Sequence, residues 1–278
     1  MITSETAVMT RNPKKSCVIY ATEKSRTATA IYWTTIQYAK TALMSMSTTA
    51  FSRLRGGGVK ATMILFDPES HEEWLKCRKS GIGGSDAGSV AGLNKYKSNV
   101  KLWSEKTGKA IPEDISEKPA VKFGKQAEPI IRELFKLNFP QYTVDYHEYR
   151  MYGTRDRPFM YATLDGELTE RETGHNGVLE IKTTTIQNSL QWSEWDNRIP
   201  DSYYVQILHQ LACTGWSFAI LYACINYISK GEKRTLFRYY RIDRNDVLSD
   251  INWLIRKETD FWESVKKNKE PDLILPEI

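Results

Sequence analysis

Apolar and polar positions alternate along the chain in patterns that predict helices and strands from residue 70 onward. Apolar residues at helical spacing predict helices near residues 70–80, 98–107, 121–138, 202–214 and 244–268. Runs rich in β-branched and aromatic residues predict strands near 143–150, 158–168, 177–184, 218–228 and 235–242. The glycine-rich segment between the first two helices predicts a tight turn and a short helix capped by Ser85 or Asp86. Helices before and after a run of strands predict one α/β domain, with a central mixed β-sheet flanked by helices.

The first 62 residues differ from the rest of the chain. They are rich in Thr, Ser and Ala, lack a sustained helical or strand period, and end in an Arg-Gly-Gly-Gly run before Met63. We therefore expect a disordered N-terminal leader over 1–62 and a single domain over 63–278. Two origins of the leader stay open. Either Met63 is the natural start and the run reflects a translated ribosome-binding site, or the leader is a genuine flexible arm. N-terminal sequencing of the native protein would separate the two.

The composition suits a globular protein, because 41% of the 278 residues are hydrophobic. The net charge of the whole chain is +5, but the leader, with nine Lys/Arg and two Asp/Glu, carries +7, whereas residues 63–278 carry −2. A nucleic-acid function must therefore rest on particular residues. The chain has no apolar run of about 18 residues and no secretory signal pattern, which predicts a cytoplasmic protein that does not contact membranes. The four cysteines form no CxxC pair and are expected to be reduced, packed thiols.

The segment GVLEIKTTT places Glu180 and Lys182 on one face of a predicted strand, with Ile181 pointing to the other. By itself this pair indicates a salt bridge that contributes roughly 0–1 kcal/mol. A second acid, Asp165, stands at a predicted Asp-Gly turn beside the preceding strand and is expected close to Glu180. Two neighbouring carboxylates repel unless a cation or a proton lies between them. Their oxygens and the Ile181 carbonyl suit Mg²⁺.

A third acid, Glu128, lies in FGKQAEPIIRELF on the same side of a predicted helix as Ile131. It is therefore expected to face the apolar side of the helix, where a carboxylate needs a partner. Pro129 belongs in a first turn or at a kink, because proline lacks an amide hydrogen. The alternative is a capping glutamate, or one salt-bridged to Arg132 or Lys125.

Together these segments resemble the PD-(D/E)XK nuclease superfamily, and within it the YqaJ-type viral recombinases related to the exonuclease of phage lambda. The resemblance covers roughly residues 70–268 and implies a restriction-endonuclease-like core. Five segments occur in the order that the family shows: RKSGIGGSDAGSVAGLNKYKSNVKLWSEKTGK, FGKQAEPIIRELF, LDGEL, LEIKT and YYVQILHQLACTG.

The resemblance implies that Asp165 and Glu180 would ligate Mg²⁺, for which Mn²⁺ could substitute, together with the backbone carbonyl of Ile181. Glu128 would complete this set directly or through water. Lys182 would orient or activate the attacking water and stabilise the charge that develops on the phosphate.

The resemblance further implies a pocket for a DNA 5′-phosphate built from Arg78, Ser85, Thr163 and Gln206. Thr163 stands where the family more commonly has Ser, but it keeps the hydroxyl. Without the resemblance, Ser85 would be interpreted as a helix cap and Gln206 as a solvated helix residue. Gln206 and Gln210 lie one helical turn apart, however, and could form a polar stripe that faces the site.

Three other side chains invite a functional interpretation. Tyr96 and Trp103, beside lysines 95, 97 and 101, are more often packing residues, with bracing of DNA as the alternative. His209 could join the polar stripe, but a hydrogen-bonded structural histidine is the stronger interpretation.

The function implied is a Mg²⁺-dependent exonuclease that resects linear duplex ends 5′ to 3′ and leaves a 3′ strand. Its partners would be double-stranded DNA ends and a single-strand annealing protein, and related enzymes form homo-oligomeric rings around DNA. One alternative is an endonuclease or a Cas4-like nuclease, although the scattered cysteines disfavour an iron–sulfur cluster. The other is a non-catalytic DNA-end-binding recombination adaptor.

Overall fold

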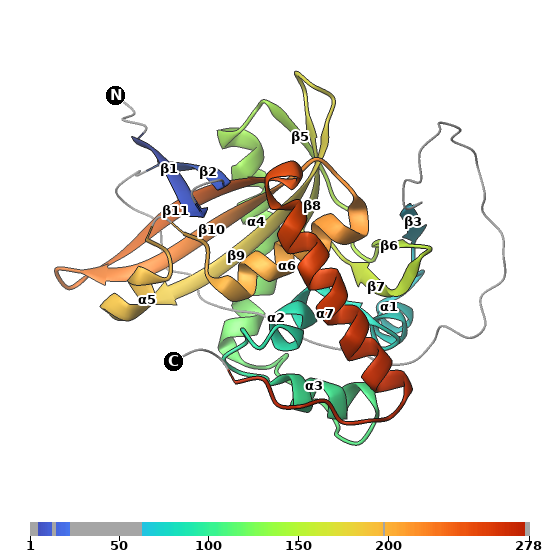
Figure 1. Cartoon of the computed structure of the whole chain (residues 1–278). Helices are drawn as coiled ribbons and strands as arrows, with labels where there is room; N and C mark the ends of the chain where they lie inside the picture. Colours follow the sequence, from blue (N-terminus) through green and yellow to red (C-terminus); the bar gives the residue numbers. More distant parts are fainter. Residues whose placement is uncertain (1–4, 13–14, 23–62, 197, 276–278) are drawn as a thin grey trace.

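The main sheet is mixed, as predicted. The structure, a computed structural model, describes residues 5–12, 15–22, 63–196 and 198–275 (Figure 1). Seven strands follow the order β1-β2-β11-β10-β9-β8-β5. Strands β9 and β10 run parallel, and the other neighbours run antiparallel. The strands are β1 (Glu5–Asn12), β2 (Lys15–Thr22), β5 (Tyr142–Asp145), β8 (Gly166–Glu170), β9 (Asn176–Ile186), β10 (Phe218–Ser229) and β11 (Glu232–Asp243).

A second, smaller sheet was not predicted. It has the order β3-β6-β7-β4 and comprises β3 (Met63–Phe66), β6 (Met151–Thr154), β7 (Arg157–Ala162) and β4 (Ile82–Gly83). The single strand expected over 158–168 is therefore wrong, because the chain leaves the small sheet after β7 and enters the main sheet at β8. Asp165 lies in the link between the two sheets, which frees its side chain from a strand face.

The five long helices that the sequence predicts are confirmed, with small differences at their ends. They are α1 (His71–Arg78), α3 (Asn99–Lys106), α4 (Pro119–Asn138), α6 (Asp201–Thr214) and α7 (Leu248–Lys266), the last preceded by the 3₁₀ turn η1 (Arg244–Val247). The short helix expected after the glycine-rich turn is α2 (Gly84–Val90), and its N-cap is Gly83 instead of Ser85 or Asp86. Helix α5 (Ser189–Ser193) was not predicted.

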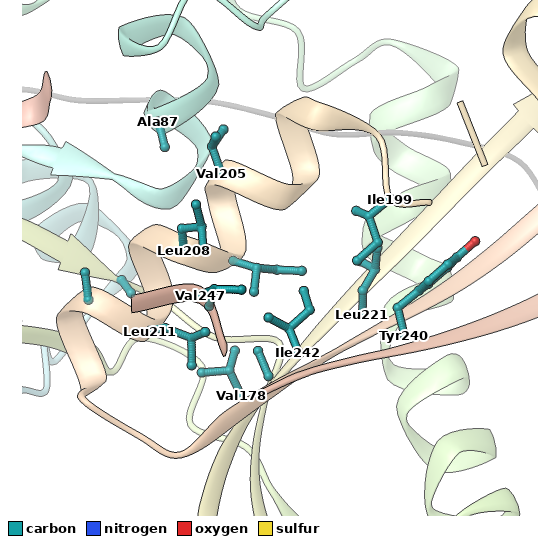
Figure 2. Packing of buried hydrophobic residues seen from close by; sticks show 14 of the residues in the cluster. Ala87, Val178, Ile199, Val205, Leu208, Leu211, Leu221, Tyr240, Ile242 and Val247 are labelled. Carbon is teal, nitrogen blue, oxygen red and sulfur yellow. The ribbon is translucent and has the colours of Figure 1, made fainter. Parts of the chain in front are cut away.

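The main sheet is covered by helices on both faces (Figure 1). Ile131 of α4 and Ile181 of β9 belong to one apolar cluster. Val178 of β9 and Leu208 of α6 belong to another, on the opposite face, which also includes residues of α7 (Figure 2). Odd and even positions of β9 thus face different helices, and the even positions, from Val178 onward, point toward α6.

Two further expectations from the sequence need correction. Within the leader, two segments form strands, and β2 pairs with β11 through Phe237 and Thr22. Residues 23–62 lie outside the described part of the chain, so the domain boundary at residue 62 stays a prediction. The strand expected over 143–150 ends at Asp145, because its partner β8 begins at Gly166 and the last pair is Asp145 with Glu167. A turn follows, in which the Arg150 amide donates to the His147 carbonyl.

The described cysteines agree with the expectation of reduced, packed thiols. Cys77, Cys213 and Cys224 are buried, free thiols. Among the described helices, none is both long and apolar enough to span a bilayer.

Candidate active site

Glu180 is held by three donors on the face of β9 that points toward α6. Its side chain is 2% exposed, and Lys182 Nζ lies 2.5 Å from its Oε1. Gln206 Nε2 donates to the same oxygen at 2.7 Å, and Gln210 Nε2 donates to Oε2 at 2.5 Å. The polar stripe predicted on α6 is thus present, and its two amides orient the Glu180 carboxylate.

Asp165 reaches the same part of β9 from the link between the two sheets. Its Oδ2 accepts a hydrogen bond from the Ile181 amide at 2.8 Å. Gly166, the next residue, pairs with Leu179 at the start of the β8–β9 register. The Asp165 carboxylate therefore lies at the backbone of the residue between Glu180 and Lys182, as the Asp-Gly turn predicted.

Glu128 combines the two interpretations that the sequence left open. The carboxylate is half-buried on α4 and is paired with Arg132 one turn later. Arg132 Nε also donates to the Asp165 carbonyl, and the guanidinium lies 3.6 Å from the Tyr146 ring centroid. Pro129 lies inside this helix, where the carbonyl four residues earlier loses its usual donor. Arg132 thus ties the helix acid to the link that bears Asp165.

The three acids share an electrostatic environment. Burial raises the pKa of Asp165 well above its ordinary value, and Glu180 and Glu128 raise it further. Burial also raises the pKa of Glu128, and the effect of Glu180 adds to it while Arg132 and Lys182 oppose it. Ionising Asp165 and Glu128 beside Glu180 therefore concentrates negative charge that the surrounding side chains do not fully offset.

A divalent cation fits this donor set. Carboxylate and carbonyl oxygens are the ligands that Mg²⁺ prefers, and its charge would offset the repulsion that raises the Asp165 pKa. Within the described parts of the chain, no three His, Cys, Asp or Glu side chains already stand as a closed ligand set. The divalent cation therefore fits this site by its charge and by the oxygen donors that the site offers.

Lys182 is an ammonium over the neutral pH range. Burial lowers its pKa, but Glu180 and Asp165 raise it by more, so the pKa lies above the ordinary value of a lysine. Its Nζ also lies 5.2 Å from the ring centroid of Tyr203. Lys182 thus provides a fixed positive charge and hydrogen-bond donors.

The residues expected to bind a 5′-phosphate flank the acidic set. Arg78 Nη2 donates to Ser85 Oγ at 3.2 Å. Beside Ser85, a Cβ added at Gly84 would lie 3.3 Å from Gln206 Cγ, so α2 approaches the glutamine that contacts Glu180. Thr163 lies in the same link as Asp165. Arg78 therefore contacts Ser85, the neighbouring Gly84 lies against Gln206, and Gln206 contacts Glu180. Thr163 precedes Asp165 by two positions in the sequence.

His209 and Trp103 are packing residues. His209 is fully buried, and its ring nitrogens lie 2.9 Å from the Glu258 carboxylate and 2.8 Å from the Tyr161 carbonyl. Trp103 is 1% exposed, and its indole donates to the Ser264 carbonyl. Tyr96 is 86% exposed, and its bracing of DNA stays a prediction.

Comparison with known proteins places the chain in a family. Residues 73–217 match the family described as the YqaJ-like viral recombinase domain. The chain belongs to this family. The family matches the resemblance drawn from the five sequence segments. A relative, the uncharacterized protein YqaJ of Bacillus subtilis (strain 168), is 33% identical over 199 residues, which are 69% of this chain and 56% of that protein. The chain therefore spans little more than half the length of that YqaJ relative.

The fold also matches a solved structure. The alkaline exonuclease LHK-Exo of Laribacter hongkongensis superposes with a TM-score of 0.52 at 19% identity. The match covers 71% of this chain and 93% of that one. At this identity the likeness establishes that the two proteins share a fold.

Sequence reasoning did not find every residue around the site. It named Arg132 only as a partner of Glu128 and missed its contact with the Asp165 carbonyl. The spacing of four residues was the only available signal, and it is common on helices. Tyr146 and Tyr203 were also missed, because an aromatic residue beside a charged one has no distinctive pattern along the chain.

Proposed function

We propose that this chain is a divalent-metal-dependent deoxyribonuclease that removes nucleotides from the ends of linear duplex DNA. The observation that carries the proposal is the hydrogen bond from the Ile181 amide to Asp165, because it joins one acid to the strand that bears Glu180 and Lys182. Membership of the YqaJ-like family, and the fold shared with an alkaline exonuclease, support the same chemistry.

Four groups would hold the metal. They are the carboxylates of Asp165 and Glu180, the Ile181 carbonyl, and Glu128 directly or through water, with Mg²⁺ as the expected ion and Mn²⁺ as a substitute. A bound divalent cation lowers the pKa of its water and offsets charge on the phosphate.

The remaining side chains of the site would orient and stabilise. Because Lys182 is an ammonium, it would donate hydrogen bonds to the attacking water or to a phosphate oxygen, and it would not remove a proton. Gln206 and Gln210 hold the Glu180 carboxylate between them. Arg132 holds Glu128 and the Asp165 backbone at a fixed separation.

We further propose that Arg78, Ser85, Thr163 and Gln206 receive the 5′-phosphate of a DNA end. The Arg78 guanidinium suits two phosphate oxygens at once, and Ser85 supplies a hydroxyl 3.2 Å from it. A phosphate bound there would set the next phosphodiester toward Glu180, which gives 5′ to 3′ polarity. The 3′ strand that remains would pass to a single-strand annealing protein. That partner and a ring-shaped homo-oligomer stay predictions of the family resemblance, and a cytoplasmic location stays a prediction of the sequence pattern.

A nuclease assay tests the proposal. Linear 5′-phosphorylated duplex should release nucleotides in Mg²⁺ and not in EDTA, and Asp165→Asn and Glu180→Gln should abolish the release. Glu117→Gln is the matched control, because that side chain is 80% exposed and pairs only with Lys122 among the contacts described. Cleavage of circular DNA would favour an endonuclease or a Cas4-like nuclease. Binding of DNA ends without hydrolysis would favour a recombination adaptor.

A further inference from the structure

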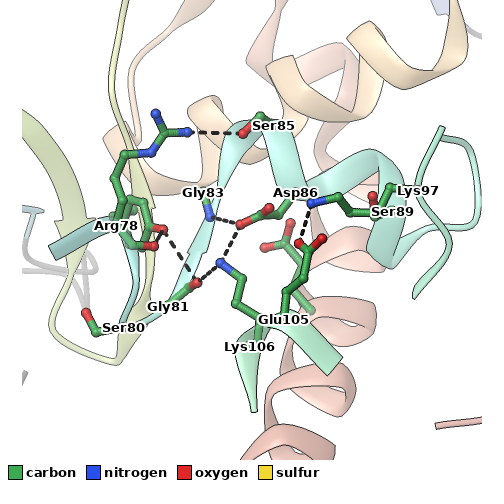
Figure 3. Close-up of polar contacts among 12 residues, drawn as sticks. Arg78, Ser80, Gly81, Gly83, Ser85, Asp86, Ser89, Lys97, Glu105 and Lys106 are labelled. Carbon is green, nitrogen blue, oxygen red and sulfur yellow. Dashed lines mark hydrogen bonds and ion pairs between the residues drawn. The ribbon is translucent and has the colours of Figure 1, made fainter. Parts of the chain in front are cut away.

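A buried ion pair lies beside the turn that joins Arg78 to Ser85 (Figure 3). Lys106, the last residue of α3, places its Nζ 2.7 Å from Asp86 Oδ2 and 2.5 Å from the Gly81 carbonyl oxygen. The same Asp86 oxygen accepts the Gly83 amide at 3.1 Å. Lys106 is 3% and Asp86 8% exposed. One lysine therefore ties residues 81, 83 and 86 to a helix that follows them in the chain.

The tied residues form the turn that separates Arg78 from Ser85. The turn also pairs with β7, where the Tyr161 hydroxyl donates to the Arg78 carbonyl. A Cβ added at Gly81 would lie 2.3 Å from the Phe159 carbonyl oxygen, so the turn has no room to shift toward the strand. Strand β7 and Lys106 thus both hold the turn, and the fixed turn sets the separation of the Arg78 guanidinium from the Ser85 hydroxyl.

The pairing also controls the local charge. Asp86 is the residue after Ser85, and an unpaired carboxylate at this position would repel a phosphate group bound at Ser85. Burial raises the pKa of Asp86, but Lys106 and the Gly83 amide lower it by more, so Asp86 stays a carboxylate. The ammonium of Lys106 offsets this negative charge, and Arg78 then remains available to an anion.

We propose that Asp86 and Lys106 are positioning residues that hold Arg78 and Ser85 in register for one terminal phosphate group, the 5′-phosphate of a DNA end. This inference rests on the proposed function, because it assigns no ligand of its own to the ion pair. It adds two residues that contact neither the DNA nor the metal but set the preference for phosphorylated ends.

The test compares binding of 5′-phosphorylated and 5′-hydroxyl duplexes of one sequence, measured by fluorescence anisotropy in EDTA. The wild type should prefer the phosphorylated end. The charge-neutral double variant Asp86→Asn/Lys106→Met should lose about tenfold of this preference, the scale of one charge-assisted hydrogen bond, and keep its affinity for the 5′-hydroxyl duplex. Asp86→Asn/Lys106→Gln, which is also charge-neutral and keeps an amide donor on the Gly81 side, is a milder second variant in case the first double variant does not fold. It should lose a smaller part of the preference.

Glu105→Gln is the matched control. Glu105 precedes Lys106 on α3, is 4% exposed, and pairs with Lys97. This variant should keep the preference for phosphorylated ends. If it loses the preference as fully as the double variant does, a general loosening of α3 is the cause and the inference is overturned.

Two other outcomes overturn the inference. In the first, the wild type shows no preference for phosphorylated ends. In the second, variants at Asp86 and Lys106 fold and retain the full preference. Hydrolysis in Mg²⁺ is measured separately on the same proteins. A wild type that prefers phosphorylated ends but hydrolyses neither duplex contradicts the nuclease proposal and leaves the positioning role supported. Active variants with unchanged preference contradict the positioning role alone.

Discussion

Replacing Arg132 by methionine should both destabilise the protein and slow the reaction. Arg132 is 6% exposed and makes three contacts, namely with the Glu128 carboxylate, the Asp165 carbonyl and the Tyr146 ring. Methionine fills a similar volume but donates no hydrogen bond. The substitution therefore removes all three contacts and leaves Glu128 beside Glu180 without its nearest cation.

The contacts set the size of the effect. A hydrogen bond to a charged group contributes about 1.5 kcal/mol or more, and a buried carbonyl left without its donor costs about 1–3 kcal/mol. A cation–π contact with a half-exposed ring adds roughly 0.5–1 kcal/mol. The free energy of unfolding should therefore fall by about 3–5 kcal/mol, which in a domain of this size lowers the Tm by roughly 6–20 °C.

Urea unfolding gives the stability, and exonuclease rates at a temperature where the variant is folded give the activity. We expect kcat/KM to fall roughly 10–100-fold, as for other groups that orient metal ligands. Arg132→Lys keeps the charge but reaches only one of the two oxygen partners, so it should recover part of each loss. Lys136→Met, one turn along the same helix and 40% exposed, should change stability by less than about 0.5 kcal/mol. An Arg132→Met protein with wild-type stability and rate would refute the role assigned to this residue.

Three further outcomes are expected. Lys182→Ala should lower kcat about 100-fold or more because it removes a fixed charge at the reacting phosphate, whereas Lys267→Ala, 70% exposed at the end of α7, should not change kcat. Because the Asp165 pKa is raised, the folded protein retains a proton that the unfolded chain has lost, so the Tm in EDTA should fall as the pH rises above about 4 toward that raised pKa. Asp165→Asn should flatten this decline of the Tm with pH. In calorimetry, Mg²⁺ at about 100 times its Kd should stabilise the wild type by about 2.7 kcal/mol but not the variant. Equal stabilisation of both proteins would contradict the role of Asp165 as a metal ligand. Glu258→Gln should lower the free energy of unfolding in urea by about 3–5 kcal/mol, because it breaks a fully buried pair with His209. The rate of the folded enzyme should not change, and a loss of rate would contradict the packing role of His209.

Local sequence patterns sufficed for most of the secondary structure and for several side-chain placements, whereas the catalytic roles were predicted from the family resemblance. The strand period alone predicted that Glu180 and Lys182 share a face, and the helical period predicted that Gln206 and Gln210 do. The Asp-Gly turn predicted a break beside Asp165. These features depend on residues a few positions apart, and such spacing is readable along the chain.

The same patterns failed where a neighbour distant in sequence decided the structure. The strand expected over 158–168 is split between two sheets because β7 pairs with β4 and β6, while β8 pairs with β9 and β5. The Asp-Gly turn marks where this run of eleven residues breaks, but it does not indicate which strands each half pairs with, because a strand pairs through its backbone. The second sheet therefore escaped prediction, although each of its strands is short and ordinary.

The sequence by itself determined which functional groups this protein has. They are three acids and a lysine suited to a metal-dependent site, an arginine and a serine seven residues apart, and the segments that mark the YqaJ-like family. Only the tertiary structure decided how these groups meet. The Ile181 amide binds Asp165, Arg132 joins Glu128 to the link before β8, and Lys106 closes the turn before Ser85. Each of these contacts except the Arg132–Glu128 pair spans more than fifteen residues, so chain folding creates the electrostatic environment that shifts the pKa values of the site.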